Sequence, residues 1–219
     1  MSFLFAPAQL PVIPVQDERY LFFPVRRLWC TKGACGEGAS ADPKSLSFFL
    51  RPTDALQPVT DAAAAILPAG ESGMGLSAGV EVAACLSEGG RCWSREEAEA
   101  AVWGWCTAVT FTRLGAPLSE AALAGPVPVS HLRPAYRTPL PGSCDMFLYL
   151  NNAKRQAGNT ARAAVDPIGV LCELSRRAEL EPGDVVLFGT PEGAAAVRAG
   201  DAVMAGVNGV GTFTVQAVA

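Results

Sequence analysis

Few residues in this chain have the type and spacing needed for acid–base or metal chemistry. Glu81 is the only charged residue in the apolar segment 79–86, and His131 is the only histidine of the chain. Because a buried carboxylate is costly unless it is paired, Glu81 is expected to have solvent access or a cationic partner such as Arg113. Hard divalent cations need several oxygen ligands, so Glu81 alone does not predict a metal site.

Seven cysteines provide the other reactive side chains, and their number and spacing predict no zinc or disulfide framework. No Cys-x-x-Cys pair occurs among them, so neither a zinc ribbon nor a thioredoxin-like motif is indicated. We expect free, buried and chemically inert thiols, which favours a reducing compartment, the cytosol or the mitochondrion. The cysteines are Cys30, Cys35, Cys85, Cys92, Cys106, Cys144 and Cys172.

Composition excludes several classes of partner. The formal charge is −4 with 17 Lys and Arg, which argues against nucleic-acid binding. Apolar runs are too short for a membrane-spanning helix. The first ten residues have no basic region and are followed by Pro11, so they make a poor signal peptide, and they also lack the arginines of a transit peptide.

The elements expected to position these residues are mostly β-strands. Strand-like runs fall at residues 25–30, 47–50, 79–86, 102–113, 144–150, 185–189 and 211–218. Ser94 with Glu97 forms a capping box that predicts a helix start, and Asp166 followed by Pro167 predicts another helix, running to about residue 178. A short helix is expected around residues 119–123. The layout is α+β and mostly β.

Two regions are expected along the chain. Residues 1–22 are rich in Pro and apolar residues without a helical period, which predicts an extended N-terminal arm. Residues 23–219 are expected to form a single domain.

Six motifs within residues 23–219 resemble a known family in matching order. They are the segments 23–30 (FPVRRLWC), 48–52 (FFLRP), 102–113 (VWGWCTAVTFTR), 158–160 (GNT), 180–193 (LEPGDVVLFGTPEG) and 199–215 (AGDAVMAGVNGVGTFTV). This pattern resembles the fumarylacetoacetate hydrolase family, and in particular its acylpyruvate hydrolases. The resemblance implies a rolled, mixed β-sheet or barrel with a few flanking helices.

The resemblance also implies a metal site, and this chain departs from it. In the family, hydrolysis or decarboxylation of 1,3-dicarbonyl acids uses Mg²⁺, Mn²⁺ or Ca²⁺, held by a Glu-x-Glu pair on one strand and an Asp on another. Those positions correspond here to Gly79, Glu81 and Thr110. Because two of the three carboxylates are missing, we predict a lost metal site and no cofactor.

The family's acid–base residues are missing from the corresponding segments as well. Residues 31–40, in place of a lid with a histidine, contain no His, and Glu37 is the nearest candidate. The lysine-bearing loop also looks shortened, because residues 116–125 contain no Lys. Thr190 matches a family residue that contacts a substrate carboxylate, although its structural role would be a tight turn at a strand end. We therefore assign no catalytic residue and treat Thr190 as a relic of substrate binding.

These absences predict a degenerate, non-catalytic homologue that serves as a structural or accessory subunit of a larger protein complex, with a mitochondrial complex as the suggested host. Its partners would be other protein subunits or a second copy of the chain. Two alternatives stay open. One is an altered or metal-independent hydrolase or decarboxylase of acylpyruvates or β-keto acids that uses Glu81, Thr190 and Glu37. The other is a sensor that binds a dicarboxylate without turnover.

Overall fold

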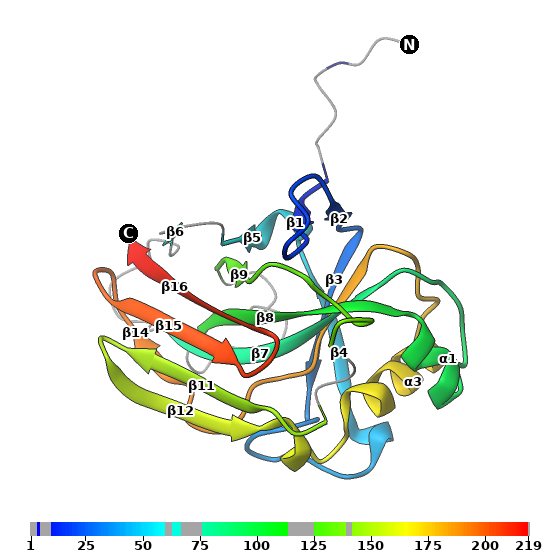
Figure 1. The fold of residues 1–219 in the computed structure, drawn as a ribbon. Helices are drawn as coiled ribbons and strands as arrows, with labels where there is room; N and C mark the ends of the chain where they lie inside the picture. Colours follow the sequence, from blue (N-terminus) through cyan, green and yellow to red (C-terminus); the bar gives the residue numbers. More distant parts are fainter. Residues whose placement is uncertain are drawn as a thin grey trace.

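The computed structural model describes residues 4, 10–59, 63–66, 76–113, 125–138 and 142–218. They form a nine-stranded sheet, a five-stranded sheet, a two-stranded hairpin and two α-helices (Figure 1). The prediction of a mostly β, rolled mixed sheet with flanking helices is confirmed. No helix among these residues is both long and apolar enough to cross a membrane.

The nine-stranded sheet is built around two long antiparallel strands, β7 (Leu76–Leu86) and β8 (Val102–Arg113). Its main path runs β4-β3-β13-β7-β8-β9-β5, with β14 beside β7 and β10 beside β8. The other strands are β3 (Arg27–Lys32), β4 (Ser47–Arg51), β5 (Leu56–Pro58), β9 (Val127–Val129), β10 (Arg133–Pro134), β13 (Asp184–Leu187) and β14 (Ala195–Val197).

The five-stranded sheet lies across one face of β7 and β8 (Figure 1). Its strands follow the order β12-β11-β15-β16-β6, with β12 at one edge. Their bounds are β6 (Ala63–Ile66), β11 (Asp145–Leu150), β12 (Ala153–Asn159), β15 (Ala202–Val207) and β16 (Gly211–Val218).

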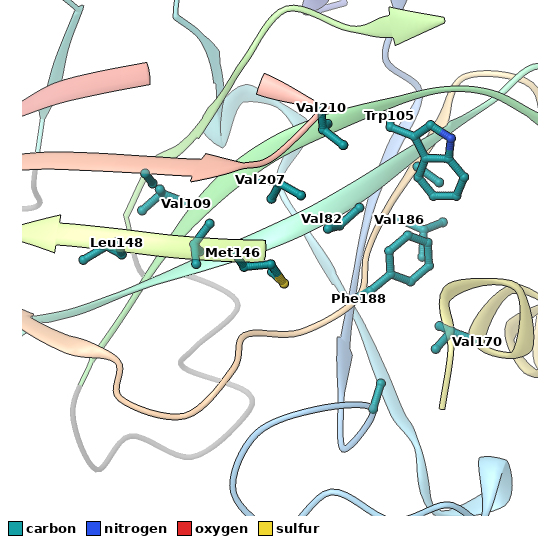
Figure 2. Close-up of a cluster of buried hydrophobic side chains, with 14 of the residues drawn as sticks. Val82, Trp105, Val109, Met146, Leu148, Val170, Val186, Phe188, Val207 and Val210 are labelled. Atoms are coloured by element: carbon teal, nitrogen blue, oxygen red, sulfur yellow. The ribbon is translucent and has the colours of Figure 1, made fainter. Parts of the chain in front are cut away.

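Every residue of β7 is buried, because both faces of this strand are covered. On one face Val82 packs into a cluster with Met146 of β11 and Val170 of the helix α3 (Pro167–Arg177). Figure 2 shows these side chains converging from both sheets and the helix. On the other face Ala83 and Cys85 pack in a second cluster with residues of β3, β9 and the N-terminal hairpin. This two-sided burial explains why the segment is an almost continuous apolar run.

The two helices begin where the sequence predicts. In α1 (Arg95–Ala100), Ser94 and Glu97 form the complete capping box. In α3 (Pro167–Arg177), Asp166 is the N-cap and accepts a hydrogen bond from the Gly169 N–H. The Asp166 carboxylate also pairs with the Arg95 guanidinium, which links the starts of the two helices.

Several segments differ from the expectation or lie beyond it, and the strands β5, β6, β9, β10, β14 and β15 were not predicted. β1 (Val12–Pro14) lies within the expected arm and forms an antiparallel hairpin with β2 (Phe22–Pro24), which crosses the expected boundary at residue 22. The boundary between arm and domain itself stays a prediction. The strand β12 was not predicted, because its sequence AKRQAGN is polar; this composition suits an edge strand. The short helix expected at residues 119–123 lies outside the described residues.

Strand pairing along one edge of β7 is interrupted, and the candidate site lies at this interruption. β13 pairs with residues 83–85 of β7, and β14 pairs with residues 76–78. The Phe188 N–H still donates to the Val82 carbonyl oxygen at 3.1 Å, but beyond it this edge of β7 has no neighbouring strand at residues 79–81. Side chains and turns from elsewhere must satisfy the buried backbone groups there.

Candidate functional site

Glu81 lies in this gap as a buried carboxyl group, with 6% of its surface exposed. The Thr110 hydroxyl donates a 2.6 Å hydrogen bond to its Oε1, and the Gly189 N–H donates a 2.8 Å hydrogen bond to its Oε2. Burial raises the pKa of Glu81, while these two hydrogen bonds and the positive charge of Arg51 lower it. Because burial is the largest effect, Glu81 holds its proton more tightly than an ordinary glutamate does.

The cation that acts on Glu81 is Arg51 on β4, a residue that the sequence did not single out. Arg51 is only 4% exposed, and its Nη2 donates to the Phe111 carbonyl oxygen at 3.1 Å. We expected Arg113 as a partner for Glu81, but Arg51 is the arginine whose charge stabilises the carboxylate. Only the tertiary packing of β4 against β3 and the central sheet brings this side chain into range.

Thr190 occupies the space that Gly79 leaves free. A Cβ atom placed on Gly79 would lie 2.4 Å from Thr190 Oγ1 and 2.8 Å from Thr190 Cβ, which is closer than real contacts allow. The preceding residue, Gly189, has φ +88°, a backbone conformation that favours glycine. The turn at residues 189–191 therefore fits against β7 because Gly79 has no side chain.

Gln156 joins the two sheets at this place and was missed by the sequence reasoning. Its Oε1 accepts from the Val80 N–H at 2.9 Å, and its Nε2 donates to Thr190 Oγ1 at 2.8 Å and to the Pro191 carbonyl at 2.6 Å. The side chain is 1% exposed, so it satisfies buried backbone groups in the gap. Its position next to the GNT motif was the only available signal. We call Gly79, Glu81, Thr110, Gln156 and Thr190 the Glu81 cluster.

A pocket of about 270 Å³ lies on the other side of the 189–191 turn. Gly189 belongs to its wall and at the same time donates to Glu81. Its apolar floor includes Val82, Met146 and Phe188, which Figure 2 shows in the core between the sheets. Further lining residues are Cys35, Gly36, Asn159, Thr160, Arg162, Pro167, Pro191 and Glu192. The Glu81 cluster thus sits directly behind one wall of a pocket.

The thiols near the site are poor nucleophiles. Burial and the neighbouring Glu81 raise the pKa of Cys30 and of Cys35 to about 12. Cys35 places its Sγ 3.6 Å from the Phe188 carbonyl oxygen, at the pocket wall. All seven cysteines are free thiols, as expected, but the expected burial is only partly correct, because Cys92 is exposed and Cys35 and Cys144 are half-buried.

Two other candidates from the sequence do not join the Glu81 cluster. Glu37 is exposed on the loop that follows β3 and is absent from the described pocket linings. His131 lies between β9 and β10, where its Nε2 is buried without a partner among the described residues. In contrast, Gly79, Glu81, Thr110 and Thr190 are brought together. Their assignment as relics of a metal and substrate site, without a catalytic residue, stays a prediction.

Among curated proteins, the chain is similar to the maleylpyruvate hydrolase of Aquipseudomonas alcaligenes, with 31% identity over 140 residues that cover 62% of this chain and 48% of that protein. It is also similar to the "Oxaloacetate tautomerase FAHD1, mitochondrial" of Bos taurus, with 29% identity over 186 residues that cover 80% and 81% of the two chains. The chain therefore spans about half the length of the hydrolase that it matches.

Solved structures give a similarity over the whole chain. The fumarylpyruvate hydrolase of Pseudomonas aeruginosa, in complex with Mn²⁺ and pyruvate, superposes with a TM-score of 0.88 and 26% identity, covering 99% of both chains. The maleylpyruvate hydrolase of Sphingobium sp. SYK-6, in complex with manganese(II) and pyruvate, gives a TM-score of 0.74 and 26% identity, covering 88% and 70%.

These relatives overturn the prediction of a non-catalytic structural or accessory subunit. They are hydrolases and a tautomerase, so the interpretation as a pseudoenzyme in a protein complex is wrong. That interpretation equated two missing carboxylates with lost chemistry. The folded chain still holds a carboxyl group of raised pKa beside a pocket, and acid–base chemistry needs such a group rather than a full ligand set.

The prediction that no cofactor is used is contradicted too, because two structural neighbours hold manganese and pyruvate. The described residues around Glu81 do not by themselves match a three-carboxylate ligand set. Gly79 has no side chain, Thr110 is neutral, and both Glu81 oxygens already accept hydrogen bonds. The described ranges contain no group of three or more His, Cys, Asp or Glu suited to a metal ion.

Among protein-family models, the one described as "Fumarylacetoacetate (FAA) hydrolase C-terminal" matches residues 30–218 of this chain. This match includes the five-stranded sheet, both described α-helices, the Glu81 cluster, the pocket and all of the nine-stranded sheet except the first three residues of β3. It agrees with the order of motifs in the sequence and with the fold. The chain belongs to the fumarylacetoacetate hydrolase family.

Proposed function

We propose that this protein is an enzyme that cleaves acylpyruvates by hydrolysis, releasing pyruvate and a carboxylic acid. Family membership and the similarity to fumarylpyruvate and maleylpyruvate hydrolases support this reaction class. Both structural neighbours named above bind pyruvate, which is the product that all acylpyruvates share. The pyruvate part of the substrate is therefore the group that the pocket must recognise.

The observation that carries the proposal is the position of Glu81 directly behind the pocket wall. Gly189 belongs to the wall of the 270 Å³ pocket and donates to the Glu81 carboxylate at 2.8 Å. A pocket of this volume suits a small oxo acid. Burial raises the pKa of Glu81 above that of an ordinary glutamate, which is the direction that favours a general acid or base.

In the proposed reaction, Glu81 transfers a proton during cleavage. Water adds to the acyl carbonyl carbon, and Glu81 accepts the proton that the water loses. The bond between this carbon and C3 of the pyruvate part then breaks, and its electron pair becomes the pyruvate enolate. The same proton passes to C3 of the enolate. The products are pyruvate and the carboxylic acid, and Glu81 returns to its initial state.

Thr190 is proposed to hold an oxygen of the substrate. Its Oγ1 accepts the hydrogen bond from Gln156 Nε2, which leaves the hydroxyl proton available for donation. Gln156 is a positioning residue in this proposal, because its Nε2 donates to Thr190 Oγ1 and to the Pro191 carbonyl oxygen and so orients the turn. Glu81 and Thr110 lie beneath the 189–191 turn, so in this proposal the turn shifts to admit the substrate to Glu81.

A second candidate reaction is keto–enol tautomerisation of a dicarboxylic oxo acid. The oxaloacetate tautomerase of Bos taurus matches 80% of this chain over 81% of its own length, a more even coverage than that of the maleylpyruvate hydrolase. Tautomerisation needs the same base to move one proton between carbon and oxygen, without the addition of water. Glu81 would serve both reactions.

One experiment separates these reactions. The purified protein is assayed with acetylpyruvate and with oxaloacetate, each in the presence of MnCl₂ and in the presence of a chelator. Pyruvate release from acetylpyruvate supports the hydrolase, whereas faster enol–keto conversion of oxaloacetate without pyruvate release supports the tautomerase. Absence of both activities in folded protein under both conditions would reject the proposed function.

We also propose a location inside the cell, in the mitochondrion or cytosol. The free thiols suit a reducing compartment, and FAHD1 relatives from several organisms are named as mitochondrial. Pairing with a second copy or with other protein subunits likewise remains a proposal. Fractionation of cells and light scattering of the purified protein test the two points.

A further inference from the structure

A second pocket of about 380 Å³ adjoins the first one along β12. The two pockets share part of their lining, which places them next to each other at the edge of the five-stranded sheet. The shared residues are Met146, Ala157, Gly158, Asn159 and Arg162. The second pocket is completed by Asp145, Phe147, Lys154 and Asn208.

Two cationic side chains line the second pocket and lie near the first pocket, in which the proposed substrate binds. Lys154 and Arg162 are exposed, and neither forms an ion pair with a carboxylate in the described part of the chain. Arg162 lines both pockets, whereas Lys154 lines only the second. Their positive charges are therefore available to an anionic ligand.

The acidic residues at the two pockets do not cancel these charges. Asp145 lines the second pocket, and its Oδ1 accepts a 2.8 Å hydrogen bond from Asn159 Nδ2. Glu192 lines the first pocket and is exposed. Neither lies within ion-pair distance of Lys154 or Arg162 in the described residues. The second pocket thus has two positive charges and one negative charge.

Arg162 is held at this boundary by a short 3₁₀ helix, η3 (Thr160–Arg162). The Asn159 side chain caps this helix by accepting a 3.0 Å hydrogen bond from the Ala161 N–H, and the Thr160 hydroxyl accepts from the Cys144 N–H at 2.8 Å. These hydrogen bonds hold the backbone beside Arg162 in place, so the Arg162 side chain extends from an ordered segment.

We propose that Arg162, assisted by Lys154, binds the far carboxylate of a dicarboxylic acylpyruvate. This inference rests on the proposed function, because it places the pyruvate part in the first pocket and the acid end of the acyl group towards the second. A guanidinium suits the task, since its planar donors match a carboxylate. The protein then prefers substrates whose acyl chain ends in a carboxylate.

The test compares succinylpyruvate with butyrylpyruvate, which have the same carbon chain and differ in a terminal carboxylate or methyl group. The wild-type protein is expected to show about tenfold higher kcat/KM for succinylpyruvate. Arg162→Gln should remove most of this preference, mainly by raising the KM for succinylpyruvate, and Lys154→Gln should remove part of it. The preference is measured as the ratio of kcat/KM for the two substrates, so a general loss of turnover that affects both substrates equally does not change it. Rising salt should weaken the preference in the wild-type protein.

Arg155→Gln is the matched control, because Arg155 is exposed on the same strand and lines neither pocket. Equal kcat/KM for both substrates in the wild-type protein, or an unchanged preference in Arg162→Gln, would refute the subsite while leaving the hydrolase intact. If neither substrate is turned over, binding is measured by calorimetry. Succinylpyruvate binding that Arg162→Gln weakens about tenfold then supports the subsite alone, and lack of binding rejects both proposals.

Discussion

Thr110 on β8 donates its hydroxyl hydrogen to Glu81 on β7 at 2.6 Å, across a diagonal of the sheet. In the register of the two strands, Thr110 faces Gly79, and Glu81 faces Ala108. Because neither Gly79 nor Ala108 has a long side chain, the two polar groups reach each other. This hydrogen bond offsets part of the free-energy cost of burying the Glu81 carboxyl group. It also lowers the pKa of Glu81, whereas burial raises it.

Glu81→Gln is expected to lower kcat by about a hundredfold or more, because general acid–base groups contribute that much to many enzymes. The steady-state rate of acylpyruvate cleavage measures the effect. Glu88→Gln is the control, since Glu88 is exposed just beyond the end of the same strand. A well-folded Glu81→Gln protein with wild-type activity would show that Glu81 is not the acid–base group.

Thr110→Val should shift the acidic limb of the pH–rate profile to higher pH. The Thr110 hydroxyl lowers the pKa of Glu81 by donating to its carboxylate, so its removal raises that pKa and a higher pH is needed to ionise the base. Thr112→Val removes a comparable hydroxyl contact, 2.9 Å from Ser77, without touching Glu81. An identical pH profile in the two variants would contradict the assignment.

The stability of the protein should depend on pH through Glu81 in a definite direction. Its folded-state pKa is raised by burial, so the folded state binds this proton more tightly than the unfolded chain, whose glutamates titrate near about 4.3. The resulting stabilisation is fully present below that value and is lost as pH rises through the folded-state pKa.

Urea unfolding of the wild-type protein and of Glu81→Gln across the range from about pH 4 to pH 8 measures this effect. The difference in free energy of unfolding should move in favour of Glu81→Gln as pH rises. Other titrating groups, such as Asp166, are common to both proteins and cancel. A constant difference across the range would mean that Glu81 has an ordinary pKa.

Gln156→Ala is expected to lower the free energy of unfolding by about 2–4 kcal/mol. The substitution leaves the Val80 N–H without its buried acceptor and releases Thr190 and Pro191, and each unsatisfied buried group costs about 1–3 kcal/mol. Gln216→Ala is the control, because Gln216 donates one exposed hydrogen bond, to the Gly200 carbonyl. Its expected cost is below about 0.5 kcal/mol.

The sequence predicted both described α-helices and seven of the strands because their signals are local; these strands are β3, β4, β7, β8, β11, β13 and β16. The apolar run ending at Leu86 and the aromatic and β-branched run ending at Arg113 became β7 and β8, and the capping box at Ser94 marks the start of α1. Asn151 and Asn152, in the turn between β11 and β12, both have positive φ, a conformation that asparagine tolerates better than most residues. By contrast, β12 was missed because its polar sequence carries no apolar alternation; it becomes a strand by hydrogen bonding to β11.

The prediction of lost function went wrong by equating a departure from a ligand pattern with the loss of catalysis. The substitutions at Gly79 and Thr110 are real, but the sequence does not show what replaces the missing side chains. In the fold, Thr190 fills the space beside Gly79, and Thr110 donates to Glu81. The named relatives, which are enzymes, corrected the functional interpretation.

By itself, the sequence determined the family, the positions of β3, β4, β7, β8, β11, β13 and β16, the starts of the two described α-helices and the presence of a lone acidic residue in a buried strand. These follow from motifs, periodicity and capping residues within short windows. Only the tertiary structure decided that Arg51 stabilises Glu81, that Gln156 bridges the two sheets, and that Arg162 stands between two pockets. Such contacts join residues far apart in the chain, and their positions depend on how two twisted sheets pack rather than on any local pattern.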